Sequence, residues 1–434
     1  MKKSVAWLAC AALVPLALTV STKASAQQAG EPLVRTGQEA TAVRGETVAT
    51  RARPELDPLG VRMGSFLLYP KLATDMTWND NVFATRNKTN DDVVFDIMPE
   101  LALQSDWNNH ALNFSTGADF GRYADFSRLD YQDYFFAGDG RLDITRDSAL
   151  FAGGSFARQH EAPGAPDFPG DAKRPTEFYQ SNGFVRHVQR LGQFRGVGDF
   201  SIVRLNYDHT DTFSGTDTSN TERDRTVYAG GYRLGYEFLP NYEAYVRGEG
   251  NWRDYDDRET VGGERVGRSS DGFSAVTGLA LDLGGVVFGD VYAGYIAQYY
   301  DDFNNVDGFT AGGTMTWNVT TLTTLNARLA RIIQDTTQAG SPAILRTTGG
   351  VSADHELLRN VILTSALTVT YDDYEDSNRD DYYYIGGIGA RYLMNRNIYG
   401  SLGYQLIRHT TSGSDSTANS YWQNLIRIGL EAQL

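Results

Sequence analysis

The sequence predicts an all-β protein, a closed antiparallel transmembrane β-barrel of about 18 strands, in a range of roughly 16–18. Three observations predict this fold. Apolar and polar residues alternate along most of the chain, short and long connections follow one another in turn, and aromatic residues gather toward the strand ends. We expect the short connections to be periplasmic turns and the long ones to be extracellular loops.

The alternation of apolar and polar residues begins near Phe66 and continues to the end of the chain. In one run Phe309, Met315 and Trp317 alternate with threonines, and the last strand alternates up to Leu434. A period of two indicates strands with two different faces. Strands are predicted to start near residues 64, 92, 111, 131, 148, 176, 196, 225, 241, 271, 286, 308, 322, 343, 359, 381, 397 and 421.

The connections between these strands alternate in length. Turns such as 239–241, 283–285 and 394–397 are short, whereas segments such as 158–175 and 208–224 are long. Strand runs of more than 10 residues also exceed the usual length of about 5–6, and a tilted strand needs about 9–11 residues to cross a bilayer. Length and connection pattern therefore favour an outer-membrane barrel over a short-stranded soluble sheet.

The inner face predicted by this register carries charged side chains, which a soluble β-sandwich or propeller would not accept in its core. The candidate lumen-lining residues are Arg204, Arg233, Arg247, Arg391, Glu243 and Glu249. Rings of arginine side chains can pass anions, but Asp and Glu residues occupy the same inward-facing positions of the alternating pattern. Two interpretations stay open: the arginines pair with acids and stiffen the wall, or they form a track for an anionic polymer.

The N-terminal region carries the features of a secretory signal peptide. Lys2 and Lys3 precede an apolar stretch, and Ala24-Ser25-Ala26 is a small-x-small cleavage pattern. We expect residues 1–26 to be cleaved, residues 27–60 to form a flexible periplasmic segment, and residues 61–434 to form the barrel. The chain's one cysteine, Cys10, would leave with the leader, which excludes thiol catalysis and disulfides.

Composition and motifs exclude several functions. The formal net charge of −15 disfavours binding to nucleic acid. None of the six histidines stands in a metal-binding spacing, and no nucleophile motif is present. Asp208 and His209 lie at a predicted outer strand end, where a catalytic pair could stand, but an Asp-His dipeptide is common and is a weak signal. We expect no enzyme, no catalytic residue, no cofactor and no metal site.

The opening of the barrel resembles a known family. Asp57-Pro58-Leu59-Gly60 leads into Gly64-Ser65-Phe66, and Asn79-Asp80-Asn81-Val82-Phe83 follows. This opening is similar to that of the putative outer-membrane β-barrel porin 2 family of proteobacteria, over roughly residues 57–434. The resemblance implies an outer-membrane barrel and a pore, and some members resemble barrels associated with exopolysaccharide export. It implies no catalytic residue.

The predicted function is a porin-like passive channel in the cell outer membrane, serving exopolysaccharide export in one version of the hypothesis. Two alternatives are a non-conducting structural or adhesion barrel and, last, an outer-membrane enzyme. The expected partners are outer-membrane lipid and lipopolysaccharide, the barrel-assembly machinery acting through the C-terminal strand, and polysaccharide export machinery. At about 16–18 strands a barrel encloses an aqueous channel unless loops or the 27–60 segment fold inward.

Overall fold

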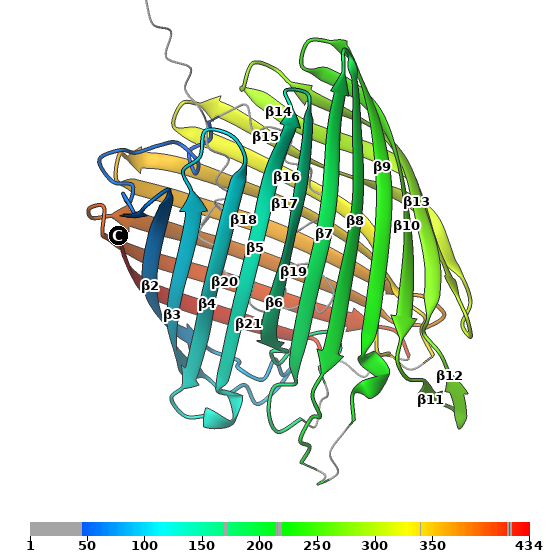
Figure 1. Cartoon of the computed structure of the whole chain (residues 1–434). Helices are drawn as coiled ribbons and strands as arrows, with labels where there is room; N and C mark the ends of the chain where they lie inside the picture. The colour runs from blue at the N-terminus through cyan, green and yellow to red at the C-terminus, as the bar shows by residue number, and fades with distance from the viewer. Residues whose placement is uncertain are drawn as a thin grey trace, which may run out of the picture.

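The structure is a computed structural model that describes residues 46–168, 172–213, 215, 219–338, 340–414, 416 and 419–434. The predicted leader, residues 1–26, and residues 27–45 lie outside the described residues. The chain forms a tilted cylinder of strands (Figure 1). None of the described residues belongs to a helix long and apolar enough to cross a membrane.

One antiparallel sheet of 19 strands makes the wall, and all but the short β1 are long strands that close into a barrel of 18. The barrel closes where β2 pairs with β21, from Lys71 opposite Gln433 to Asn79 opposite Leu425. Every predicted strand is present, and each begins within a few residues of its predicted start. The long strands are β2 (Phe66–Asn79), β3 (Asp92–Ser105), β4 (Ala111–Tyr123), β5 (Tyr131–Thr145), β6 (Ser148–His160), β7 (Glu177–Leu191), β8 (Phe194–Tyr207), β9 (Arg225–Leu239), β10 (Tyr242–Tyr255), β13 (Ser270–Asp282), β14 (Val287–Tyr300), β15 (Val306–Thr320), β16 (Thr323–Gln334), β17 (Ile344–Leu358), β18 (Val361–Tyr374), β19 (Asp380–Leu393), β20 (Ile398–Ser412) and β21 (Tyr421–Gln433).

The two ends of the barrel differ, as predicted. Tight turns lie at the end drawn uppermost in Figure 1, and the long connections lie at the opposite end. We call these the turn end and the loop end. The loop end carries the hairpin of β11 (Glu259–Val261) and β12 (Glu264–Val266) and the short 3-10 helices η1 (Ser127–Leu129) and η2 (Thr221–Arg223). At the turn end β1 (Val61–Met63) folds back on β2.

Residues that tolerate a positive φ make the tight turns. Gly284 (φ 64°) and Gly285 (φ 77°) connect β13 to β14, and Asn241 (φ 69°) connects β9 to β10. Glycine and asparagine adopt this left-handed conformation at little cost, which suits the turns of twisted hairpins. These turns explain why strand boundaries could be located from the sequence at this end.

The outer face of the wall is apolar. Phe309 is 62% exposed and Ile388 61% exposed, although both are large apolar side chains. Such a continuous apolar surface on a closed barrel is typical of a wall in contact with lipid. Exposed aromatic side chains near the strand ends form the predicted girdles: Trp78, Trp252, Tyr299, Tyr382 and Trp422 toward the loop end, and Phe194, Phe238, Trp317 and Tyr392 toward the turn end.

Buried apolar side chains form small clusters at the two ends of the barrel. At the loop end Phe178, Leu205 and Tyr207 make one such cluster under the long connections. At the turn end Val48 from the N-terminal segment packs with Ile362 of the wall. Tyr207 also lies at a strand end, but it belongs to no girdle because its ring is buried inside the barrel.

Candidate functional site

The inner wall of the barrel carries five of the six predicted lumen residues. Register and exposure place Arg233, Arg247, Arg391, Glu243 and Glu249 on the face opposite the exposed Leu234, Val246 and Tyr392. All five are in ion pairs. Arg233 Nη2 lies 2.6 Å from Glu243 Oε1, and Arg391 Nη2 lies 3.0 Å from Glu431 Oε1.

Arg247 is held between two carboxylates. Its Nη2 lies 2.7 Å from Glu249 Oε2 on the same strand and 3.4 Å from Asp199 Oδ2 on β8. All three side chains are partly exposed to the interior of the barrel. The geometry thus favours the first of the two interpretations left open by the sequence, in which arginines pair with acids across strands.

A glycine makes room for one of these pairs. Glu243 folds over Gly235 to reach Arg233, and a Cβ at Gly235 would lie 2.3 Å from Glu243 Oε1. A larger residue there would displace the carboxylate and break the pair. Gly235 on the inner face of β9 is therefore a requirement for the pairing of Glu243 with Arg233.

Arg204 does not line the lumen, contrary to the prediction. It shares its phase on β8 with Phe200 and Ile202, which are exposed on the outer face. There it forms an ion pair with Asp256. The alternation predicted the wrong face for Arg204 because its neighbours Val203, Leu205 and Tyr207 are apolar and yet face inward, beneath the long connections.

Charged side chains are distributed unevenly around the inner wall. Facing inward on β3–β6 are Asp92, Asp96, Glu100, Asp119, Asp133, Asp139, Arg141 and Asp143, which we call the acidic sector. Facing inward on β7–β10 are Arg186, Arg190, Arg195, Asp199, Arg225, Arg233, Glu237, Glu243, Arg247, Glu249 and Arg253, which we call the paired sector.

Hydroxyl, amide and imidazole groups contact several carboxylates of the acidic sector. The Tyr131 hydroxyl donates to Asp96 Oδ1 at 2.6 Å, and the Asn113 amide donates to Asp139 Oδ2 at 3.1 Å. Asp133 contacts His160 Nδ1 at 3.0 Å and stands directly opposite Asp119 in the sheet register. Two carboxylates of the sector have basic partners, Lys71 for Glu100 and Arg141 for Asp143. The Tyr131 hydroxyl and the Asn113 amide carry no charge of their own, so they add no counterion to the wall.

A long connection crosses the loop end of the barrel. Asp167 Oδ1, between β6 and β7, accepts hydrogen bonds from the backbone N–H of Thr337 at 3.0 Å and from its hydroxyl at 2.9 Å. Gly164 of the same connection accepts a hydrogen bond from the Tyr421 hydroxyl at 3.4 Å. Thr337 follows β16, which lies almost opposite β6 in the ring of strands. Residues 161–168 therefore form a constriction across the mouth at the loop end of the barrel.

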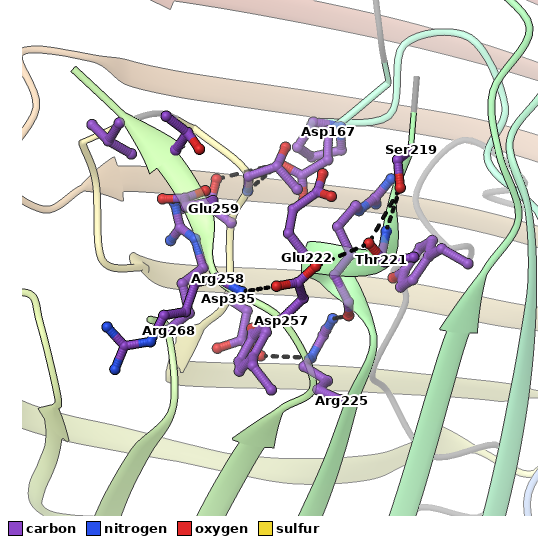
Figure 2. A pocket seen from close by; sticks show the side chains of 18 of the residues that line it. Asp167, Ser219, Thr221, Glu222, Arg225, Asp257, Arg258, Glu259, Arg268 and Asp335 are labelled. Atoms are coloured by element: carbon purple, nitrogen blue, oxygen red, sulfur yellow. Dashed lines mark hydrogen bonds and ion pairs between the residues drawn. The ribbon is translucent and has the colours of Figure 1, made fainter. Parts of the chain in front are cut away.

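Beside this constriction lies a cavity of about 490 Å³, which we call the outer vestibule. Residues from four different connections converge on it, among them Asp167, Glu222, Asp257, Glu259 and Asp335 (Figure 2). Its walls combine carboxylates and guanidiniums with threonine and serine hydroxyls. Such a volume suits a small hydrophilic molecule.

Buried ion pairs fix the vestibule walls. Asp335 lies 3.0 Å from Arg225 Nε and 2.5 Å from Arg253 Nη1, and Glu161 pairs with Arg223. Arg268 Nη2 lies 2.8 Å from Glu259 Oε1, and its Nη1 donates to the Ser341 carbonyl at 2.7 Å. The pairs of Asp335 and Glu161 join different segments, and Arg268 links its own connection to Ser341 after β16, so these contacts attach the loops to one another and to the strands.

Burial and charge act in opposite directions on these carboxylates. Burial alone would raise the pKa of Asp335, but Arg253 and Arg225 outweigh it and lower that pKa to about 2. Burial raises the pKa of Glu161, and the neighbouring Arg223 offsets this only in part. Asp335 is therefore a permanent anion near neutral pH that anchors the loop after β16.

Sequence reasoning missed the vestibule because its residues lie in long connections without periodicity. Glu161 and Arg223 are 62 residues apart, and no local pattern signals their pairing. Asp208 and His209, considered for catalysis, are both exposed and do not line the vestibule. Among the described residues no group of three or more His, Cys, Asp or Glu side chains could hold a metal ion.

Comparison with known proteins shows a family. The model of the family described as "Putative beta-barrel porin 2" matches residues 53–434. No curated protein matches the sequence.

Several solved structures are similar in shape. The outer membrane protein opdK from Pseudomonas aeruginosa is 11% identical, with 85% of this chain and 98% of that chain covered and a TM-score of 0.43. The copper transporter OprC is 9% identical, with 86% and 84% covered and a TM-score of 0.46. The alcaligin receptor FauA from Bordetella pertussis is 11% identical, with 84% and 76% covered and a TM-score of 0.40.

Proposed function

The chain belongs to the putative beta-barrel porin 2 family, and we propose that this porin-like barrel is a passive channel for small hydrophilic solutes across the outer membrane. The observation that carries the proposal is the charged inner wall. Arg247, Asp199 and Glu249 face the inside of a closed barrel, and their side chains stay partly exposed there. Removing such charges from water costs several kcal/mol per ion, so a hydrated lumen is the environment that suits them.

The acidic sector supports a preference for cations. Charges lining a narrow, low-dielectric passage concentrate ions of opposite sign and repel ions of the same sign. In the paired sector Arg233 and Arg247 lie beside carboxylates that weaken their field, whereas most of the charged side chains that face inward on β3–β6 are carboxylates. We propose that the wall selects cations and neutral solutes over anions.

The constriction supports an upper limit on solute size. Residues 161–168 cross the outer mouth and are bonded to Thr337 and Tyr421 on other parts of the ring. Exopolysaccharide export would require this connection to move aside for each chain of polymer, and it stays a prediction from the sequence resemblance. Contacts with lipopolysaccharide, with the assembly machinery through β21 and with export machinery belong to the same proposal and await their own tests.

A test of conduction uses the refolded full barrel in liposomes. Swelling rates with a series of neutral sugars of increasing size should fall steeply between monosaccharides and larger oligosaccharides. Planar-bilayer recordings should show discrete conductance steps. Absence of both swelling and steps from a folded, heat-modifiable barrel would contradict the channel and favour the non-conducting structural barrel.

A further inference from the structure

Residues 46–57, which we call the N-terminal strap, lie inside the barrel at the turn end. The backbone N–H of Val48 donates to Thr324 Oγ1 at 3.0 Å, and Asn318 Nδ2 donates to the Glu46 carbonyl at 3.0 Å. At the other end of the strap, the Tyr399 hydroxyl donates to the Leu56 carbonyl at 2.6 Å. These partners belong to inner-face positions near the turn end of β15, β16 and β20, so the strap passes over the strand ends from β15 to β20.

One apolar side chain anchors the strap to the wall. Val48 is 1% exposed and packs with Ile362, Leu393 and Tyr399, which all face inward. Leu56 adds a partly buried contact to the same cluster. Burying one valine stabilises this contact by roughly 1.5–3 kcal/mol.

One buried ion pair provides the second anchor. Arg53 Nη2 lies 2.8 Å from Glu356 Oε2 on β17, and the two residues are 3% and 5% exposed. The same guanidinium donates to the carbonyls of Val48 and Arg51 and so holds the strap in its compact shape. Arg51 Nη1 lies 3.4 Å from Glu356 as well, so this one carboxylate fixes the strap.

The strap differs from the wall in how it is held. It contains no strand residue and adds nothing to the sheet ladder, whereas each wall strand is hydrogen-bonded along both edges. A segment held by a few side-chain contacts opens at a lower free energy than a strand within a closed sheet. The barrel can therefore keep its fold while the strap leaves its place.

We propose that the N-terminal strap is a gate for the turn-end mouth, closed when Val48 and Arg53 occupy their sites on the wall and open when both are released. This inference rests on the proposed channel function. Release uncovers the inward ends of β15–β20 and widens the mouth, so the channel has a smaller and a larger conductance state. Glu356 becomes hydrated on opening, which limits the cost of separating it from Arg53.

The test is single-channel recording of full-length variants. Val48→Asp introduces a charge into an apolar pocket and should hold the gate open, with a larger unitary conductance than the wild type. Glu356→Arg should raise the ratio of open to closed dwell times by about a hundredfold, because it removes a buried charge partner. Arg53→Glu combined with Glu356→Arg should restore part of the closed state.

A matched control lies at the same end of the barrel. Arg62 Nη2 is 2.8 Å from Asp106 Oδ2 in an exposed pair outside the strap, and Arg62→Ala should leave conductance unchanged. Heat-modifiable migration checks that each barrel is folded.

Two results would overturn the proposal, and they can be told apart. If the wild type conducts and Val48→Asp and Glu356→Arg show the same steps and dwell times, the strap lies outside the conduction path and only the gate fails. If all folded variants are silent, the channel function fails, and the gate with it.

Discussion

The acidic sector and the paired sector of the inner wall are built from the same kind of strand but differ in the ratio of acidic to basic side chains. In the paired sector Arg233 and Arg247 lie within ion-pair distance of carboxylates. In the acidic sector Asp96 and Asp139 accept hydrogen bonds from neutral donors. The difference teaches that a high density of charged side chains does not by itself create a field, because only charges without a nearby counterion act on a passing solute.

The largest expected effect comes from removing the charge of the acidic sector. The combined substitution Asp119→Asn, Asp133→Asn and Asp139→Asn should lower the cation-to-anion permeability ratio toward one, since it removes three inward-facing negative charges from the acidic sector. Reversal potentials in a salt gradient measure the ratio. A ratio equal to that of the wild type would show that selectivity arises elsewhere.

The matched control in the paired sector is Glu249→Gln. Arg247 then keeps Asp199 as its partner. The substitution removes one negative charge next to an ion pair that remains. We expect a smaller fall in the permeability ratio than with the triple substitution. Equal effects would remove the distinction between the two sectors.

The next prediction concerns Arg247, the basic partner of Asp199 and Glu249. Arg247→Ala leaves Asp199 and Glu249 without their shared guanidinium and should raise cation selectivity. The loss of charged hydrogen bonds should lower the free energy of unfolding by roughly 1–2 kcal/mol. Denaturant titration followed by tryptophan fluorescence measures the second quantity, and unchanged stability would show that the pair contributes only to the field.

The outer vestibule should respond to acid. The pKa of Asp335 is lowered from 3.8 to about 2, so its stabilising pairs with Arg225 and Arg253 are fully present above pH 3.8. They are lost as the pH falls through about 2. Conductance noise and protease cleavage in residues 335–343 should rise in that window and stay flat from pH 7 to 5. An increase already at pH 6 would contradict this assignment.

The smallest effect is expected for Arg204→Ala. Because Arg204 faces outward and pairs with the exposed Asp256, its removal should leave ion selectivity unchanged. Stability should change by less than about 1 kcal/mol. A clear shift in reversal potential would place Arg204 in the lumen after all and overturn the register of β8.

The strand pattern could be predicted from the sequence because period two and turn residues are local signals. The turn at Gly284 and Gly285 is one example, and the alternation ending at Leu434 is another. The inner positions of Arg233 and Glu243 follow from the same period. The family resemblance over residues 57–434 is confirmed by the match over residues 53–434.

The side-chain contacts that narrow the barrel at its loop end and at its turn end could not be predicted from the sequence. Asp167 meets Thr337 across 170 residues, and Arg53 meets Glu356 across 303, so no local pattern reports either contact. Arg204 was misplaced for a related reason. Where loops cover the inner wall, apolar residues such as Leu205 face inward. There the alternation of apolar and polar residues no longer distinguishes the lipid-facing side of a strand from the lumen-facing side.

The measurement that tests the central claim most directly is the reversal potential of the refolded wild-type barrel across a tenfold gradient of potassium chloride. A potential of the sign set by potassium flux is predicted, because the acidic sector dominates the field in the lumen. A potential set by chloride would contradict the account, since it would mean that the arginines of β7–β10 act as free charges despite their carboxylate partners.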